Sequence, residues 1–220
     1  NSLVTLNLYN FDTSNVITMS GMFNNCSKLV KLDVSNFNTS KVTNISYMFS
    51  NCNQLTILDI NKWNTSKVTT MSCIFQKCTN LRTLDVSNFD TSNVTDMSYM
   101  FYNCNQLTTI DVSNFDTSKV TTMYCMFWNC NQLVTLNVSN FNTSKVTNMR
   151  SMFEDCSNLT TLDVSNFDTS KVTDMSYMFK ECLTLTHIDG LEKFDTSNVT
   201  TMNSMFSASS HIGNGKLILD

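Results

Sequence analysis

The sequence predicts an α/β repeat fold, a right-handed parallel solenoid of about eight 26-residue coils, each with a short strand and a short helix or 3₁₀ turn. Three regularities predict it. The valine of a T-S-x-V step returns after 26 residues six times and then after 27, an aromatic residue stands five positions before each valine, and a cysteine stands ten positions after the first seven. The valines are Val16, Val42, Val68, Val94, Val120, Val146, Val172 and Val199.

The end of each unit alternates apolar and polar residues, the pattern of a half-exposed strand. In the copy LTTLDVS, we expect Leu162 and Val164 to face inward. Thr161, Asp163 and Ser165 should then face outward. Each unit is therefore predicted to contribute one short strand.

Apolar residues at intervals of three and four form a helical or 3₁₀ stripe in the middle of each unit. In one unit the stripe consists of Met97, Met100, Phe101, Cys104 and Leu107. Asp96, just before the first methionine, is suited to cap this turn. The stretch NFDTS before the valine is typical of a corner, where the Asp90 side chain can bond the backbone of Ser92.

A single unit cannot bury its own apolar face, so the copies must stack on one another. Parallel strands lie about 4.8 Å apart, so eight coils would form a rod or shallow arc about 40 Å long. We predict one solenoid domain over residues 1–220, with the repeats in 1–206 and an irregular C-terminal cap in 207–220.

The repeated FDTSxVTxMSxMFxxC, as in Phe167 to Cys182, together with the strand and turn LxxLDVSNF, resembles a leucine-rich repeat. More narrowly, residues 1–206 resemble the BspA-like leucine-rich-repeat surface proteins, in the branch known from mycoplasma lipoproteins. The resemblance implies a leucine-rich-repeat-like solenoid in a secreted or surface-anchored bacterial protein used in adhesion, host contact or virulence. The chain departs from the pattern in its tail, and it shows no lipid-attachment signal, so the anchor is inferred.

Charge and hydropathy argue against several classes of protein. Fourteen basic and eighteen acidic residues give a formal charge of -4, which does not favour a nucleic-acid surface. No apolar run approaches ~18 residues, so we expect no membrane span. The chain begins at Asn1 without a signal peptide, which was either removed or belongs to a longer parent chain.

Catalytic motifs are not found in this sequence, and we expect a protein that is not an enzyme and has no catalytic residues. His187 and His211 are its two histidines, and no nucleophile elbow, zinc-protease, P-loop or dinucleotide-binding motif occurs. The cysteines lack the short spacing of a zinc site. We therefore expect no cofactor and no metal.

The cysteine ladder is predicted to consist of buried free thiols. Ladder cysteines would lie about 5 Å apart, but their side chains all point the same way, which is poor geometry for disulfides. A cysteine also fills small apolar spaces well. Cys73 and Cys125 occupy a slot that holds tyrosine in other coils, and we expect these two to be exposed.

An acidic ladder on the predicted strands is the first candidate binding surface. It consists of Asp33, Asp59, Asp85, Asp111, Asp163 and Asp189, with Asn137 interrupting it. Like charges in neighbouring coils repel, which favours a cation or a basic partner at Asp85, Asp111 and Asp163. Alternatively, each carboxylate accepts hydrogen bonds from neighbouring backbone or hydroxyl groups.

An aromatic group at positions that vary between coils is the second candidate. It comprises Tyr99, Tyr102, Tyr124 and Trp128, with Arg150. Tyrosine, tryptophan and arginine dominate the energetics of protein interfaces. The patch is either a docking site or a set of aromatics that only cover the coil.

The function that these observations favour is a non-enzymatic, extracellular or cell-surface repeat protein with a binding surface. Its ligand would be a protein or glycan on a host or neighbouring cell, and the chain is expected to be a monomer. One alternative is a structural spacer that displays another domain. Another is an ice-binding protein, whose face would be one of two ladders, Thr13 through Thr196 or Thr43 through Thr200.

Overall fold

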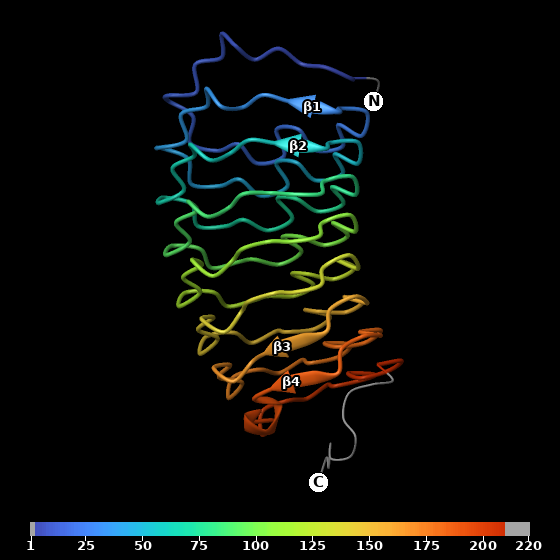
Figure 1. Cartoon of the computed structure of the whole chain (residues 1–220). Helices are drawn as coiled ribbons and strands as arrows, with labels where there is room; N and C mark the ends of the chain where they lie inside the picture. Colours follow the sequence, from blue (N-terminus) through green and yellow to red (C-terminus); the bar gives the residue numbers. More distant parts are fainter. Residues whose placement is uncertain (1–2, 210–220) are drawn as a thin grey trace.

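The computed structural model describes residues 3–209, whose coils follow one another along a single axis in chain order (Figure 1). Parallel bridges connect equivalent residues of successive coils. They run through Thr18, Asn44, Thr70, Asp96, Thr122, Asn148, Asp174 and Thr201. The repeats therefore stack as a solenoid, as the sequence predicts.

The apolar stripe in the middle of each unit was expected to form a short helix or a 3₁₀ turn, and within residues 3–209 it forms single turns bonded three residues back and no helix. The backbone N–H groups of Tyr99, Phe101 and Asn103 donate to carbonyls of the next coil, at 2.8, 2.9 and 2.7 Å. The intervening N–H groups bond three residues back, as from Tyr102 to Tyr99 at 3.1 Å. Because alternate donors leave the segment, no helical ladder can build up. We call residues 96–103 and their equivalents the turn face.

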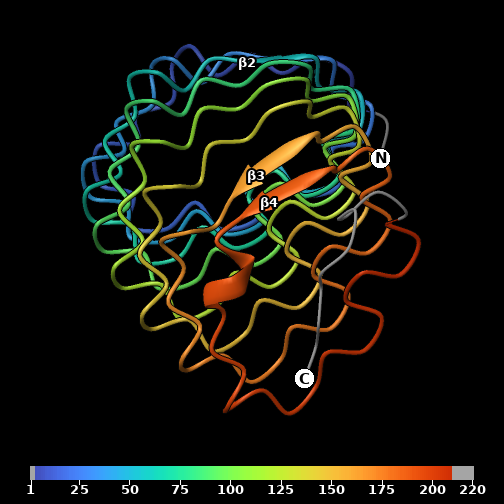
Figure 2. The same cartoon turned by 60° about the horizontal axis from the view of Figure 1, so that its bottom comes forward.

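Left-handed backbone at two positions of each turn face reverses the chain between these turns. In one coil they are Tyr99 and Asn103, with φ of 58° and 59°. A left-handed residue interrupts an α-helix, which explains why the stripe at helical spacing misled the prediction. The one helical element in residues 3–209 is the 3₁₀ turn η1 (Leu191–Lys193), in the coil nearest the C-terminus (Figure 2).

Strands form in only some of the coils, so the expectation of one strand per unit is wrong in its detail. The strands β1 (Lys31–Leu32) and β2 (Ile57–Leu58) pair in parallel, as do β3 (Thr161–Asp163) and β4 (His187–Asp189). We call these segments and their equivalents, such as 83–85, the strand face.

Like charges oppose closer approach on the strand face, where Asp85 and Asp111 lie in adjacent coils. Hydrogen bonds from the Ser113 side chain and backbone lower the pKa of Asp111, and the neighbouring charge of Asp85 partly opposes this lowering.

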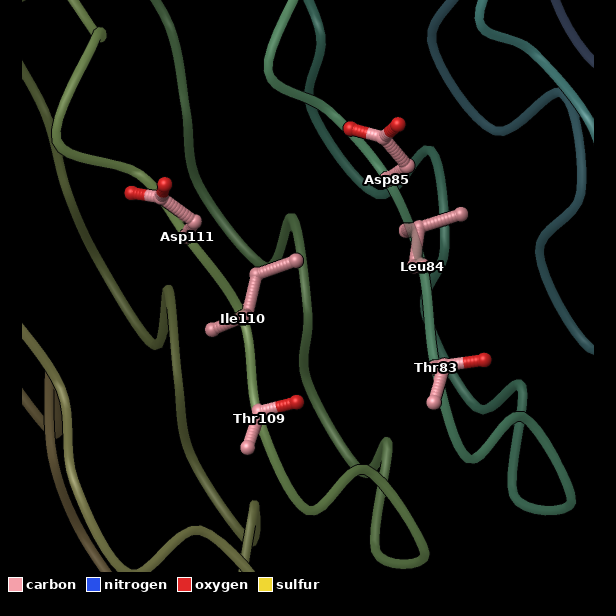
Figure 3. A pocket seen from close by; sticks show the side chains of 6 residues that line it. All are labelled: Thr83, Leu84, Asp85, Thr109, Ile110 and Asp111. Atoms are coloured by element: carbon pink, nitrogen blue, oxygen red, sulfur yellow. The ribbon is translucent and has the colours of Figure 1, made fainter.

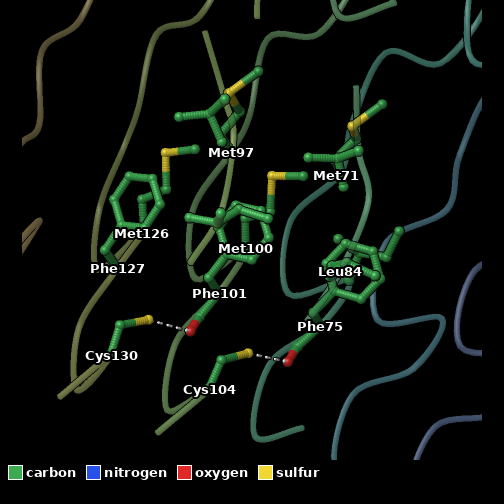
Figure 4. Packing of buried hydrophobic residues seen from close by; sticks show 14 of the residues in the cluster. Met71, Phe75, Leu84, Met97, Met100, Phe101, Cys104, Met126, Phe127 and Cys130 are labelled. Carbon is green, nitrogen blue, oxygen red and sulfur yellow. Dashed lines mark hydrogen bonds between the residues drawn. The ribbon is translucent and has the colours of Figure 1, made fainter. Parts of the chain in front are cut away.

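Ladders of identical apolar residues fill the interior (Figure 4). The cysteine ladder lies beside the Phe ladder, and the Cys104 and Cys130 thiols donate to the carbonyls of Phe75 and Phe101, both at 3.1 Å. Ser209, in the cysteine position of the last copy, donates to the Phe179 carbonyl in the same way. All nine cysteines are free, as predicted.

The corner before each valine is closed by two sets of side-chain bonds. Asp90 accepts a hydrogen bond from the Ser92 N–H at 3.0 Å, as expected. Thr117, which is 1% exposed, accepts from the Asn142 N–H at 2.7 Å and donates to the Asn142 carbonyl at 3.0 Å. Its equivalents Thr13, Thr39, Thr65, Thr91, Thr143 and Thr169 are buried too. Of this first threonine ladder only Thr196 is exposed, so the ladder does not form a surface that could meet ice.

The expected C-terminal cap is described only in part. Residues 207–209 continue the turn pattern of the other coils, whereas 210–220 lie outside the described residues. Within residues 3–209, no helix has the length and apolar character required to cross a membrane.

Candidate binding surfaces

The strand face contains a shallow depression between two middle coils (Figure 3). Leu84 and Ile110 lie between a threonine row and an acidic row, and both are buried. A second depression continues it across the coils that contain Asp111 and Asp163. The structure thus brings two of the three predicted strand-face carboxylates, Asp85 and Asp111, to one depression and Asp163 to the next.

These carboxylates cap their own turns. Oδ1 of Asp85, Asp111 and Asp163 accepts the backbone N–H of the serine two residues later, each at 2.9 Å. The same serine side chain and backbone lower the pKa of all three carboxyls. The alternative interpretation, in which each carboxylate accepts neighbouring hydrogens, is confirmed. A binding role for these residues stays a prediction.

The four aromatic residues of the turn face form one cluster, which we call the aromatic cluster. Tyr99 packs edge-on against Tyr124 with ring centroids 4.8 Å apart, and against Tyr102 at 5.6 Å. Tyr102 in turn stacks on Trp128 at 4.6 Å, with 29° between the ring planes. All four side chains are half-buried. Their contact was expected from the sequence, whereas their role in binding remains untested.

Arg150 lies beside this cluster and contacts other groups. Its guanidinium lies 4.9 Å from the centre of the Tyr177 ring and 3.8 Å from a carboxylate oxygen of Asp174. Arg150 is therefore part of a charged region in the two following coils, and the predicted patch of five residues divides at this point.

Charged residues on both sides of the aromatic cluster were not selected from the sequence. Lys77 places its ammonium 5.9 Å from the centre of the Tyr102 ring. Lys180 bonds Glu154 at 3.1 Å and Glu181 at 3.2 Å. A signal for them existed, because they occupy the two repeat positions that hold Tyr102, Trp128 and their following asparagines. Reading both positions as columns along the axis would have found them.

Cys73 and Cys125 are buried, contrary to the prediction that they are exposed. They are 3% and 0% exposed. Tyr47 of the preceding coil lies beside the Cys73 thiol, while Tyr124, Ser151 and Tyr99 lie beside that of Cys125. Burial raises the pKa of the two thiols to about 11 and about 12. Neither thiol is suited to act as a nucleophile at neutral pH.

Within residues 3–209, no group of three or more histidine, cysteine or acidic side chains is placed to hold a metal ion. The pair of His187 and Asp189, 2.7 Å apart on the exposed strand β4, is explained as a local hydrogen bond.

Comparison with known sequences identifies the repeat. Residues 2–57, 50–136 and 131–217 match the family described as "Mycoplasma protein of unknown function, DUF285". The chain belongs to this family. The predicted resemblance to BspA-like leucine-rich-repeat proteins of the mycoplasma branch is thereby confirmed. No curated protein matches the chain.

One solved structure supports the fold of this family member, and a second is less similar. A leucine-rich repeat protein from Eubacterium ventriosum ATCC 27560 is 25% identical, with a TM-score of 0.53 over 82% of this chain and 44% of its own. The T. pallidum leucine-rich repeat protein is 18% identical, with a TM-score of 0.44 over 80% of this chain and 62% of its own. The chain thus spans less than half the length of the Eubacterium protein.

Proposed function

We propose that this DUF285 family member is a non-enzymatic repeat protein that binds another protein through its turn face. The observation that carries the proposal is the aromatic cluster. The positions of Tyr102, Tyr124 and Trp128 hold serine, glutamine or asparagine in the first three coils, so the scaffold does not require aromatic residues there. Aromatic groups that the fold does not need are the usual anchors of protein interfaces.

Polar atoms in the aromatic cluster support this choice. The Tyr102 hydroxyl and the Trp128 ring nitrogen form no hydrogen bond with residues 3–209 and can donate to a partner. On the strand face, by contrast, Asp85, Asp111 and Asp163 already cap their own turns. We therefore assign docking to the turn face.

The proposal also concerns the location of the protein and the kind of partner that it binds. Relatedness to bacterial leucine-rich repeat proteins supports a place at the outer surface of the cell or in the medium, and a role in adhesion or host contact. The lack of catalytic motifs in the sequence supports a binding function without catalysis.

A binding screen tests the proposal. The chain and its Tyr102→Ala/Trp128→Ala variant would be assayed against immobilised extracellular-matrix proteins, with Asp85→Asn/Asp111→Asn as the matched strand-face control. We expect binding that the aromatic variant loses and the acidic variant keeps. Loss in the acidic variant alone would move docking to the strand face. No binding by the folded chain would favour the spacer interpretation.

A further inference from the structure

Charge is distributed unevenly along the turn face, on either side of the aromatic cluster. On the N-terminal side, Lys77 forms no ion pair within residues 3–209. On the C-terminal side, the turn face of the next two coils holds four acidic and two basic residues. These are Arg150, Glu154, Asp155, Asp174, Lys180 and Glu181. In the coils of the cluster, the one charged residue on the turn face is Asp96, at its far edge.

Ion pairs within the C-terminal group leave one carboxylate without a cation. Arg150 contacts Asp174, and Lys180 is shared by Glu154 and Glu181. Asp155 is half-buried and has no such pair within the described residues. Burial first, and then Glu181 and Glu154, raise the pKa of Asp155, and the smaller opposing effect of Lys180 does not cancel this rise. This carboxylate therefore lies where an additional positive charge would be favourable.

A buried acceptor without a donor lies one coil before Asp155. Asn129 donates its side-chain amide to Oδ1 of Asn103 at 2.7 Å, while its own Oδ1 is buried and has no hydrogen-bond partner. Asn129 follows Trp128 directly and is equivalent to Asp155 in the repeat. The Asn129 oxygen beside Trp128 is therefore a buried acceptor without a donor, a condition that costs free energy.

We propose that the turn face binds an extended protein segment that lies along the solenoid axis. An apolar or aromatic side chain of this segment packs on Tyr102 and Trp128. A lysine or arginine of the segment bonds Asp155 and Glu181, and an acidic side chain lies toward Lys77. This inference rests on the proposed function and adds the chemistry of the partner and its direction.

Spacing supports an extended segment. Lys77 and Asp155 occupy equivalent positions three coils apart, and coils that are paired by hydrogen bonds repeat at about 4.8 Å, so the two charges are separated by about 15 Å. An extended chain rises about 3.3 Å per residue, so four or five residues bridge that length.

A displayed library of random nine-residue peptides, selected on the intact chain, tests the inference. We expect enriched peptides with an aromatic or apolar centre, an acidic residue on one side and lysine or arginine on the other. The consensus peptide should bind Asp155→Asn/Glu181→Gln about tenfold more weakly, with a smaller dependence on salt. A peptide with the two charges exchanged should lose a similar factor. Asp85→Asn/Asp111→Asn is the control and should bind normally.

The outcomes separate the inference from the proposed function. Equal binding to Asp155→Asn/Glu181→Gln, with loss in Tyr102→Ala/Trp128→Ala, would overturn the charge order and keep the docking face. Unchanged binding in the aromatic variant would overturn both. Failure of the library, together with glycan-array binding that the aromatic variant loses, would overturn the peptide partner and retain the turn face.

Discussion

Successive coils are connected differently on the turn face and on the strand face. On the turn face every second backbone N–H reaches the next coil, as at Tyr99 and Phe101, while the side chains differ from coil to coil. On the strand face the side chains repeat almost unchanged, and in the middle coils few backbone bonds connect neighbours.

This contrast indicates where specificity can reside. Backbone bonds form with almost any side chain, so the turn face can hold glutamine, tyrosine, tryptophan, glutamate or lysine at one repeat position. On the strand face Asp85 and its equivalents form the caps themselves, so a replacement must also be able to cap the turn, as Asn137 does. The face held by its backbone is the one that is free to vary its side chains.

Two glycines give the largest expected difference between the faces. After β4, a Cβ on Gly190 would lie 2.1 Å from the Ser165 Cα, so the backbones must separate. Gly190→Ala should lower the free energy of unfolding by about 3 kcal/mol. On the turn face, Gly21 has φ of 65° and its nearest neighbour is Asn24 at 3.8 Å. Gly21→Ala should cost about 1 kcal/mol, from backbone strain alone.

Urea denaturation of the two variants measures this difference. Other coils hold Tyr47, Cys73 and Ser151 at the position of Gly21, which already shows that a side chain is accommodated there. Similar losses in both variants would mean that the strand face near the insertion can open as readily as the turn face.

Two threonine substitutions test whether the corner or the strand face contributes more to the stability of the stacked coils. Thr117→Val removes the hydroxyl that pairs the N–H and carbonyl of Asn142, and should cost about 2 kcal/mol because buried polar groups stay unpaired. Thr109 lines the strand-face depression, and its hydroxyl forms no hydrogen bond within residues 3–209. Thr109→Val should change stability by less than about 0.5 kcal/mol. Equal costs in urea denaturation would show that the strand face bears as much of the stacking as the corner.

Asp85 on the strand face and Asp155 on the turn face should contribute to the pH dependence of stability with opposite sign. Hydrogen bonds from Ser87 lower the pKa of Asp85 in the folded state, so its stabilisation is present above pH ~4 and is lost as the pH falls further. Burial raises the pKa of Asp155, so its ionised form opposes folding at neutral pH, and this penalty disappears as the pH falls through the raised pKa.

Asparagine substitutions separate these two contributions. Asp155→Asn should stabilise the chain at pH 7 and give no gain near pH 3. Asp85→Asn should leave stability at pH 7 slightly lower or unchanged, because asparagine caps the same turn at Asn137, whose Oδ1 accepts the Ser139 N–H at 3.1 Å. It should also flatten the loss of stability below pH ~4. Thermal melts at pH 3, 5 and 7 provide the measurement, and the same sign for both variants would contradict the comparison.

Much of the solenoid could be predicted from the sequence because identical residues must occupy identical environments. The 26-residue period predicted the stacking, and the local bond of Asp90 to Ser92 followed from side-chain reach alone. The turn face could not be predicted in detail. The spacing of its apolar residues suits a helix. The left-handed backbone at Tyr99 goes together with the hydrogen bond that the Tyr99 N–H donates to the next coil, and this bond between coils is not evident from the sequence of one unit.

The candidate site could also be predicted only in part. The aromatic cluster lay in columns that vary among coils, so Tyr102 and Trp128 could be found by aligning the repeats. The burial of Cys125 could not, because it depends on how tyrosines of adjacent coils close over a small side chain. The same holds for the unpartnered oxygen of Asn129, which depends on the orientation of one amide.

The smallest expected effect is that of replacing Lys77, which should raise stability and weaken binding. It tests whether a residue of the turn face lowers the stability of the fold while it contributes to binding. Lys77 has φ of 57°, at a position where Asn51, Asn103 and Asn129 have the same left-handed backbone. Asparagine tolerates this conformation better than lysine, so Lys77→Asn should raise the free energy of unfolding by roughly 0.5 kcal/mol. It should also weaken binding of the consensus peptide, because the ammonium beside Tyr102 is lost. A variant that is both more stable and equally able to bind would show that Lys77 serves neither purpose.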